Sequence, residues 1–201
     1  MKIKICGITN LEDALHAVAC GADALGFNFY EKSSRYISPE AATEIIAQLP
    51  DNILRIGVFV NSPAKDIHQL RSVLDFVQLH GDEAPDYAKS LIDDGIKVIK
   101  AIHAEDAAAS LEYKAVGFLL DTPTIGYGGS GETFDWELAV KFKKVVPEFY
   151  LAGGLTPENV SDAIRAVRPT AVDVCSGVEL SKGKKDPKKV AAFIEAVRSV
   201  S

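Results

Sequence analysis

The chain has 201 residues, of which 47% are hydrophobic and 25% are charged, a composition typical of globular proteins and unlike that of disordered or fibrous chains. Its formal net charge of -6 argues against a nucleic-acid partner, and its apolar runs fall short of the roughly 20 residues that cross a membrane. The three cysteines form no CxxC pair, which predicts free thiols instead of a disulfide framework or a zinc site.

The first residues, MKIKICGI, look like a strand and not like a charged leader followed by an apolar segment. Together with the free thiols, this pattern predicts a cytoplasmic protein. A chain of this length is expected to bury enough surface to form one domain, residues 1–201, without help from a metal or a disulfide.

Eight short apolar runs, many of them rich in Val, Ile or Phe, recur along the chain and predict eight strands. Stretches with helical spacing lie between them, so strand alternates with helix throughout. The predicted strands fall within residues 3–8, 22–30, 54–60, 75–81, 97–103, 115–121, 149–155 and 171–177.

Several helix starts are marked by a capping residue followed by proline, which is tolerated at the first helical position because its missing N–H has no helical partner there. The first helix is expected to begin at Thr9, with Glu12 at the spacing of a capping box, and to end before Gly21. The capping pairs are Ser38-Pro39, Ser62-Pro63, Thr156-Pro157 and Asp186-Pro187.

Eight strands that alternate with helices can close into a (β/α)8 barrel or spread into a doubly wound open sheet. Polar residues at alternate positions near strand ends favour closure, because one face of each barrel strand looks into the interior below the active site. These residues are Lys4 and Cys6, Gln78 and His80, and Asp173 and Cys175. The predicted fold is therefore a single-domain TIM barrel, with the open sheet as the alternative.

Two loops near the C-terminus have the chemistry of a phosphate site. Gly153 and Gly154 let backbone N–H groups approach an anion closely, and the helix expected to begin at Thr156-Pro157 directs its positive end at the same place. Ser176 and Gly177 follow the eighth strand with a hydroxyl and a second small-residue turn. Loops after strands seven and eight bind phosphate in many TIM barrels, so these residues predict a phosphorylated substrate.

Cys6 and Asp121 each end a predicted strand and are the candidates for acid–base chemistry. A buried space-filling role competes with a basic thiolate for Cys6, and Lys4 could supply the positive charge that a thiolate needs. Asp121 follows an apolar run that would favour its protonated form, although an ordinary loop carboxylate has the same pattern. A glycine-rich loop from Gly126 to Gly131 follows and is expected to close over substrate.

The other candidates are weaker. Arg35 could hold a carboxylate with its planar fork, or it could be a solvated loop residue. His80 and His103 end the fourth and fifth strands without a matching acid pattern, so we expect them only to line the pocket. Cys20 and Cys175 are interpreted as core residues. The basic cluster of Lys182, Lys184, Lys185, Lys188 and Lys189 is interpreted as a solvated loop.

Eight motifs, in order along the chain, resemble those of phosphoribosylanthranilate isomerases, from residue 2 to about Lys185. They are KICGIT, GFNFYEKSSRYIS, GVFVN, VQLHGDE, LLDT, GYGGSGETFDW, AGGLTPENV and AVDVCSGVE. The resemblance implies a (β/α)8 barrel that converts N-(5'-phosphoribosyl)anthranilate to 1-(2-carboxyphenylamino)-1-deoxyribulose 5-phosphate. This Amadori rearrangement belongs to tryptophan biosynthesis and uses neither metal nor organic cofactor.

Residue by residue, the resemblance makes Cys6 the general base, Asp121 the general acid and Arg35 the partner of the anthranilate carboxylate. Gly153, Gly154, Ser176 and Gly177 fall in the family's phosphate loops, and His80 and Asp173 are expected to contact the substrate. Four positions depart from the family pattern, namely Asn28, Ser34, Ala152 and Cys175. The last two put in doubt only whether hydroxyl side chains there join the phosphate site.

Two other functions fit the same fold. The related isomerase of histidine biosynthesis acts on a substrate with two phosphates, but it uses an aspartate where this chain has Cys6, and Asn61-Ser62-Pro63 lacks the glycine pair of a second phosphate loop. A non-catalytic phosphosugar-binding barrel would keep the glycine loops without needing both Cys6 and Asp121. We expect a small phosphosugar substrate, with no nucleic acid or membrane as a partner.

Overall fold

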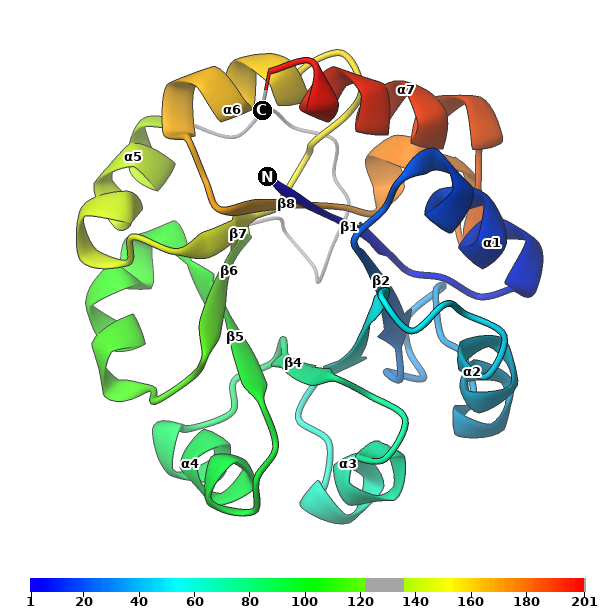
Figure 1. The fold of residues 1–201 in the computed structure, drawn as a ribbon. Coiled ribbons are helices and arrows are strands. Elements are labelled where there is room, and N and C mark those ends of the chain that lie inside the picture. The colour runs from blue at the N-terminus through cyan, green and yellow to red at the C-terminus, as the bar shows by residue number, and fades with distance from the viewer. Residues whose placement is uncertain (122–135, 201) are drawn as a thin grey trace.

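The computed structural model describes residues 1–121 and 136–200. Eight parallel strands form a closed barrel in the order β1 to β8, so the predicted (β/α)8 barrel is confirmed and the open sheet is wrong. Figure 1 shows the strands as an inner ring that the helices surround. Closure is made by β1 and β8, where Lys4 lies in register with Asp173.

All eight predicted strands are present. Their bounds are β1 (Lys2–Cys6), β2 (Ala24–Asn28), β3 (Leu54–Phe59), β4 (Phe76–Leu79), β5 (Val98–His103), β6 (Gly117–Asp121), β7 (Phe149–Leu151) and β8 (Ala171–Val174). A short antiparallel hairpin, β9 (Glu179–Ser181) with β10 (Lys184–Lys185), follows β8. The sequence pattern did not predict this hairpin.

Helical segments lie between the strands. Their bounds are α1 (Leu11–Cys20), α2 (Pro39–Ile46), α3 (Ala64–Leu70), α4 (Pro85–Asp93), α5 (Trp136–Val145), α6 (Val160–Val167) and α7 (Pro187–Arg198), with 3-10 segments η1 (Ala104–Glu112) and η2 (Ser176–Val178). In Figure 1, α7 lies beside α1, so the two ends of the chain meet on one side of the barrel. Among the described residues, no helix has the length and apolar character needed to cross a membrane.

Two of the predicted helix caps are confirmed. The side chain of Ser38 accepts a hydrogen bond from the N–H of Ala41, and that of Asp186 accepts from the N–H groups of Lys188 and Lys189. The predicted end of α1 is also confirmed, because Gly21 takes the left-handed conformation with φ of 102°.

The other three predicted caps are wrong by one to three residues. At α1 the cap is Asn10 and not Thr9, because the Asn10 amide oxygen accepts from the N–H of Asp13. At α3 the chain turns helical only after Pro63, which has no side-chain oxygen to offer. At α6 the Asn159 side chain accepts from the N–H of Thr156, which holds a separate turn ahead of the helix.

The barrel interior is filled in two parts. A cluster of small and branched side chains, formed by Ala24, Ile56, Ile99, Leu119 and Ala152, packs inside the ring of strands. Next to it lie three buried polar side chains, Lys4, Gln78 and Asp173, which are at most 7% exposed. The alternation of polar residues in β1, β4 and β8 therefore marks the inward face, as predicted.

Candidate active site

The buried ammonium of Lys4 organises the polar end of the barrel. Its Nζ donates to Gln78 Oε1 at 2.8 Å and to Asp173 Oδ2 at 2.9 Å. Burial alone would lower the pKa of Lys4, but the charges of Asp173 and Cys6 raise it instead. Burial also raises the pKa of Asp173 to about 7, against the opposing effect of the Lys4 charge. Lys4 is therefore a permanent positive charge beneath the site.

Cys6 ends β1 directly above Lys4. Its neighbour on β2 is Gly26, and a Cβ at that position would lie 2.7 Å from the Cys6 Sγ and 3.1 Å from the Lys4 Cε. Glycine is needed there because any side chain would overlap with the thiol. The structure thus leaves space for the Cys6 sulfur next to a buried cation.

Cys175, interpreted from sequence as a core residue, lies beside Cys6 in the site. The sulfur of Cys175 shares a hydrogen bond with that of Cys6, and this contact lowers the pKa of Cys6 well below its usual value. Burial opposes the shift, whereas the charges of Lys4 and Lys185 add to it. The interpretation was wrong because the chain turns at Cys175, immediately after β8, and the side chain faces the site.

Of the two thiols, Cys6 is the one that loses its proton more readily, because its pKa is lowered and that of Cys175 is raised. The Cys175 Sγ lies 3.9 Å from the Glu179 Oε1, and a carboxylate at that distance disfavours a second anion. The hydrogen bond to Cys6 and burial together raise the pKa of Cys175. The pair is therefore a Cys6 thiolate that accepts a hydrogen bond from the Cys175 thiol.

A buried ion-pair cluster surrounds the two sulfurs. Lys185 Nζ donates to Glu179 Oε1 at 3.3 Å and to the carbonyl oxygen of Cys175 at 3.2 Å, and the side chain of Lys185 is 1% exposed. The interpretation of the basic cluster as a solvated loop is therefore wrong for Lys185, because the β9–β10 hairpin folds it inward. Despite burial, Arg35 and Lys185 lower the pKa of Glu179.

Arg35 is bound within the site and is not a solvated loop residue. Its Nε donates to Glu179 Oε1 at 3.0 Å and its Nη2 to Glu179 Oε2 at 2.7 Å. The loop that carries Arg35 is braced by Asn28, whose side chain accepts from the N–H of Tyr30 and donates to the Ser33 hydroxyl. The departure from the family pattern at Asn28 thus has a structural role in shaping this loop.

Asp121 is paired with a histidine, contrary to the apolar surroundings expected from its strand. His80 Nε2 lies 3.0 Å from Asp121 Oδ2, and His80 Nδ1 lies 2.8 Å from Gln78 Nε2. The expectation that no acid pairs with His80 is therefore wrong. Sequence alone could not reveal this pair, because 41 residues separate the two positions and only barrel closure brings β4 and β6 to the same interior.

The loops after β7 and β8 approach each other closely. Gly153 and Gly154 both have positive φ, 82° and 61°, a backbone conformation that favours glycine. A Cβ on Gly177 would lie only 1.9 Å from the carbonyl oxygen of Leu155, so only glycine fits between these loops. Ser176 begins the short η2 segment at the same place. The four residues predicted for the phosphate site therefore belong to adjacent loops.

Other predicted features lie elsewhere. The glycine-rich loop from Gly126 to Gly131 is outside the described residues. Asn61 braces the loops after β3 and β4, since its N–H donates to Glu83 and its side chain accepts from the N–H of Asp82. His103 is exposed at the end of β5 and is not buried in the site.

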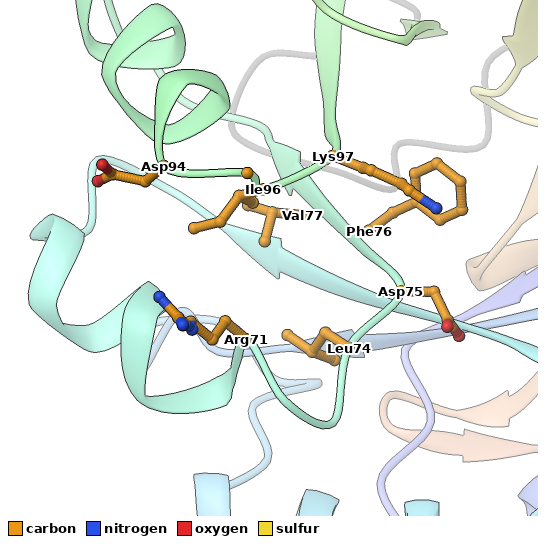
Figure 2. Close-up of a pocket in the computed structure, with 9 residues that line it drawn as sticks. Arg71, Leu74, Asp75, Phe76, Val77, Asp94, Ile96 and Lys97 are labelled. Atoms are coloured by element: carbon orange, nitrogen blue, oxygen red, sulfur yellow. The ribbon is translucent and has the colours of Figure 1, made fainter.

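A hollow of about 330 Å³ lies at the opposite end of the barrel, where β4 and β5 begin. Figure 2 shows that Arg71, Asp75, Asp94 and Lys97 surround it, with Phe76 and Val77 between them. Catalytic groups of TIM barrels lie at the carboxyl ends of the strands, so this hollow is on the wrong face for the chemistry of Cys6 and Asp121.

Sequence reasoning overlooked three contributors to the site. Cys175 is predicted to lie in the core and Lys185 in solvent, and Glu179 falls within the AVDVCSGVE motif without a predicted role of its own. The SGVE stretch after β8 was the available signal, because the loops that follow the strands build the active sites of TIM barrels.

The comparisons with known proteins all point to one family. The family model described as N-(5'phosphoribosyl)anthranilate (PRA) isomerase matches residues 3–196. A curated N-(5'-phosphoribosyl)anthranilate isomerase from Thermotoga neapolitana is 47% identical, with 100% of both chains covered. The crystal structure of the phosphoribosyl anthranilate isomerase from Thermotoga maritima superposes with a TM-score of 0.93 at 48% identity, covering 99% of each chain.

A further solved structure similar to this chain is a complex with a ligand. It is a phosphoribosyl anthranilate isomerase bound to reduced 1-(o-carboxyphenylamino)-1-deoxyribulose 5-phosphate. That protein is 45% identical to this chain, with a TM-score of 0.88 and 99% of each chain covered.

Proposed function

The chain belongs to the N-(5'-phosphoribosyl)anthranilate isomerase family, which converts N-(5'-phosphoribosyl)anthranilate to 1-(2-carboxyphenylamino)-1-deoxyribulose 5-phosphate in tryptophan biosynthesis, and we propose the following roles for its residues. The observation that carries the proposal is the placement of a thiolate and a carboxyl group, Cys6 and Asp121, at the same end of one barrel. An Amadori rearrangement needs an acid to open the sugar and a base to remove a carbon-bound proton.

Asp121 acts first, as the general acid. Its carboxyl group protonates the furanose ring oxygen, the bond from that oxygen to C1' breaks, and the anthranilate nitrogen becomes part of a protonated Schiff base. The positive imine withdraws electrons from C2' and makes its proton acidic. Ring opening thereby prepares the step that the base performs.

Cys6 acts second, as the general base. Its thiolate removes the proton from C2', and the electron pair of that C–H bond forms the double bond of an enolamine. Tautomerisation of the enolamine then gives the ketone of the product. The Cys175 hydrogen bond and the charges of Lys4 and Lys185 lower the pKa of Cys6 and so favour the thiolate that this step needs.

Arg35 holds the anthranilate carboxylate. A guanidinium has five N–H donors, of which Glu179 takes one on Nε and one on Nη2. The remaining donors can bind a second carboxylate while Glu179 holds the plane of the fork in place. Because Arg35 and Cys175 both contact Glu179, the anthranilate end of the substrate would lie next to the base.

The phosphate is bound by Gly153, Gly154, Ser176 and Gly177. Backbone N–H groups make most of the hydrogen bonds to the phosphate, since Ala152 and Cys175 offer no hydroxyl.

His80 and Asp173 remain predicted substrate contacts. The Oδ1 of Asp173 is buried without a hydrogen-bond partner in the described part of the structure, which supports a contact there. The proposed reaction needs no metal or organic cofactor, and the free thiols support a cytoplasmic location.

The direct test is a fluorescence assay with purified protein. Anthranilate ribotide is fluorescent, and its signal should decay when enzyme is added. The two-phosphate substrate of the histidine-pathway isomerase serves as the control and should not turn over. Turnover of the control substrate alone would identify the rival isomerase, and turnover of neither substrate would favour a non-catalytic phosphosugar-binding barrel.

We predict that the pH dependence of turnover responds to Cys175. Because the pKa of Cys6 is lowered, the thiolate persists above that pKa and kcat/KM falls as the pH drops through it. Cys175→Ala removes the hydrogen bond that is the largest cause of the lowering, so the acid limb of the kcat/KM profile should move to higher pH. Cys175→Ser keeps a hydrogen-bond donor to Cys6, so it should shift the acid limb less than Cys175→Ala does. Identical acid limbs in all three proteins would show that Cys175 does not tune the base.

We also predict that Gly177→Ala separates the two phosphate loops. Its methyl group would overlap with the Leu155 carbonyl oxygen, so the two loops must move apart. This movement should lower the free energy of unfolding by about 1–3 kcal/mol. Loss of one hydrogen bond to the phosphate should raise KM about tenfold. Gly117→Ala is the matched control, because its nearest neighbour would lie at 3.7 Å. Equal KM values for the two variants would remove Gly177 from the phosphate site.

A further inference from the structure

Four side chains form a continuous chain of hydrogen bonds across the barrel interior. Lys4 Nζ lies 2.8 Å from Gln78 Oε1, Gln78 Nε2 lies 2.8 Å from His80 Nδ1, and His80 Nε2 lies 3.0 Å from Asp121 Oδ2. The side chains come from β1, from β4 and the residue that follows it, and from β6, so no single segment of sequence contains them. The buried cation is thereby connected to the proposed general acid.

The direction of every hydrogen bond in this chain follows from its first member. An ammonium only donates, so the Gln78 atom that faces Lys4 must be the amide oxygen. The amide nitrogen then faces His80 and donates to Nδ1, which must present a lone pair. A neutral imidazole with a lone pair on Nδ1 carries its proton on Nε2, and that proton is donated to Asp121.

We propose that His80 is a positioning residue for Asp121, held by Lys4 and Gln78 as the neutral tautomer with its proton on Nε2. The inference rests on the proposed role of Asp121 as general acid and adds how that acid is prepared. His80 occupies Asp121 Oδ2 as a donor, which favours the other oxygen as the carrier of the catalytic proton. It also orients the carboxyl plane before the substrate arrives.

A neutral ring matters for the acid step. An imidazolium would donate from both nitrogens, but the Gln78 amide N–H points at Nδ1 and opposes a proton there. A charged histidine against Asp121 would hold the carboxyl group as a carboxylate and prevent it from giving a proton. Gln78 thus favours the neutral form of His80, which donates a hydrogen bond to Asp121 without forming a salt bridge.

The surroundings of His80 hold the ring in place. The backbone N–H of His80 donates to the Phe59 carbonyl at 2.8 Å, and the N–H of the next residue, Gly81, donates to both oxygens of the buried Glu83. Among the described residues, the groups that bind the ring are Gln78 from β4 and Asp121 from β6, with the charges of Lys4 and Asp173 behind Gln78. A preorganised donor of this kind loses little freedom when the reaction begins.

The tautomer can be measured without any catalysis. Nitrogen-15 NMR of histidine-labelled protein distinguishes protonated from unprotonated ring nitrogens, and the His80 signals are assigned by their loss in His80→Gln. We expect Nδ1 to be unprotonated and Nε2 protonated in the free enzyme at neutral pH. A protonated Nδ1, in the neutral or the charged ring, would overturn the proposal.

The kinetic test uses two amides of different length. Gln at position 80 can place its amide nitrogen near the His80 Nε2 position, whereas Asn reaches only the Nδ1 position. His80→Asn should lower kcat by about 100-fold and change KM much less, because the acid is misplaced while other residues still hold the carboxylate and phosphate ends of the substrate. His80→Gln should recover most of this loss. Equal defects in both variants, or a raised KM with normal kcat, would contradict a positioning role.

Gln78→Glu is an isosteric variant that tests whether Gln78 sets the tautomer of His80. A carboxylate accepts from both Lys4 and His80, so Nδ1 should become protonated and kcat should fall about 100-fold, as for His80→Asn. An unchanged Nδ1 signal in this variant would sink the idea that Gln78 sets the tautomer. If Asp121→Asn proved fully active, the proposed acid role would fail separately, because the NMR result does not depend on turnover.

Discussion

Cys6→Ala is expected to lower kcat by about 1,000-fold, because it removes the only atom proposed to take the C2' proton. KM should change little, since the anthranilate carboxylate and the phosphate are held by other residues. The space around the thiol is bounded by Gly26, so alanine leaves a small void without forcing the strands apart. Steady-state fluorescence kinetics on the purified variant give both constants, and circular dichroism confirms the fold.

Two further variants separate base chemistry from packing. Cys6→Ser restores nearly the same volume but replaces a thiolate with a hydroxyl that stays protonated near neutral pH, so its kcat should be as low as that of Cys6→Ala. Cys20→Ala is the matched control for a cysteine outside the site, on α1, and should be fully active. Substantial activity in Cys6→Ser would mean that Cys6 fills space and that another group removes the proton.

Asp121→Asn is expected to lower kcat by a similar factor of about 1,000, because an amide has no proton to give to the ring oxygen. The shape of the side chain is kept, and the asparagine oxygen can still accept the hydrogen bond from His80. The loss should therefore fall on the ring-opening step and not on folding. Rapid mixing of enzyme with anthranilate ribotide measures that step directly.

The control for this prediction is Asp162→Asn, which changes an exposed carboxylate on α6 that pairs only with its helical neighbour Arg165 among the described residues. This variant should match the parent enzyme in kcat and KM. A substrate analogue that is already ring-opened should bypass the defect of Asp121→Asn and restore the later steps. Failure of the analogue to bypass the defect would show that Asp121 has a different role.

Local sequence patterns predicted much of the fold. The alternation of short apolar runs with helical spacing is repeated eight times, and the inward polar positions such as Lys4 and Gln78 follow from the two-residue period of a strand. Helix caps were less predictable. Thr9 and Thr156 have suitable side chains, but Asn10 caps α1 through the N–H of Asp13, and Asn159 binds the N–H of Thr156 in a turn ahead of α6. Neighbouring candidates for a helix cap differ only slightly in free energy, so a sequence pattern cannot decide which of them caps the helix.

The candidate site was predictable where a residue type and a strand end coincide. Cys6, Asp121 and the glycines of the two C-terminal loops belong to this class, because barrel topology places every strand's carboxyl end at one face. Cys175 is a wrong prediction although it directly follows β8, because a free cysteine is also a common core residue. Its position beside Cys6 depends on the pairing of β8 with β1, which joins the two ends of the chain.

By itself, the sequence predicted the barrel, the inward polar positions and the strand ends at which chemistry is proposed. The tertiary structure decided which polar groups meet: Cys175 with Cys6, Lys185 with Glu179, and His80 with Asp121. These contacts favour the proposed charge state of Cys6 and the proposed orientation of Asp121, and they join residues far apart in the sequence, such as His80 and Asp121. Electrostatic interactions act through space, so they are fixed only when closure of the barrel fixes the distances.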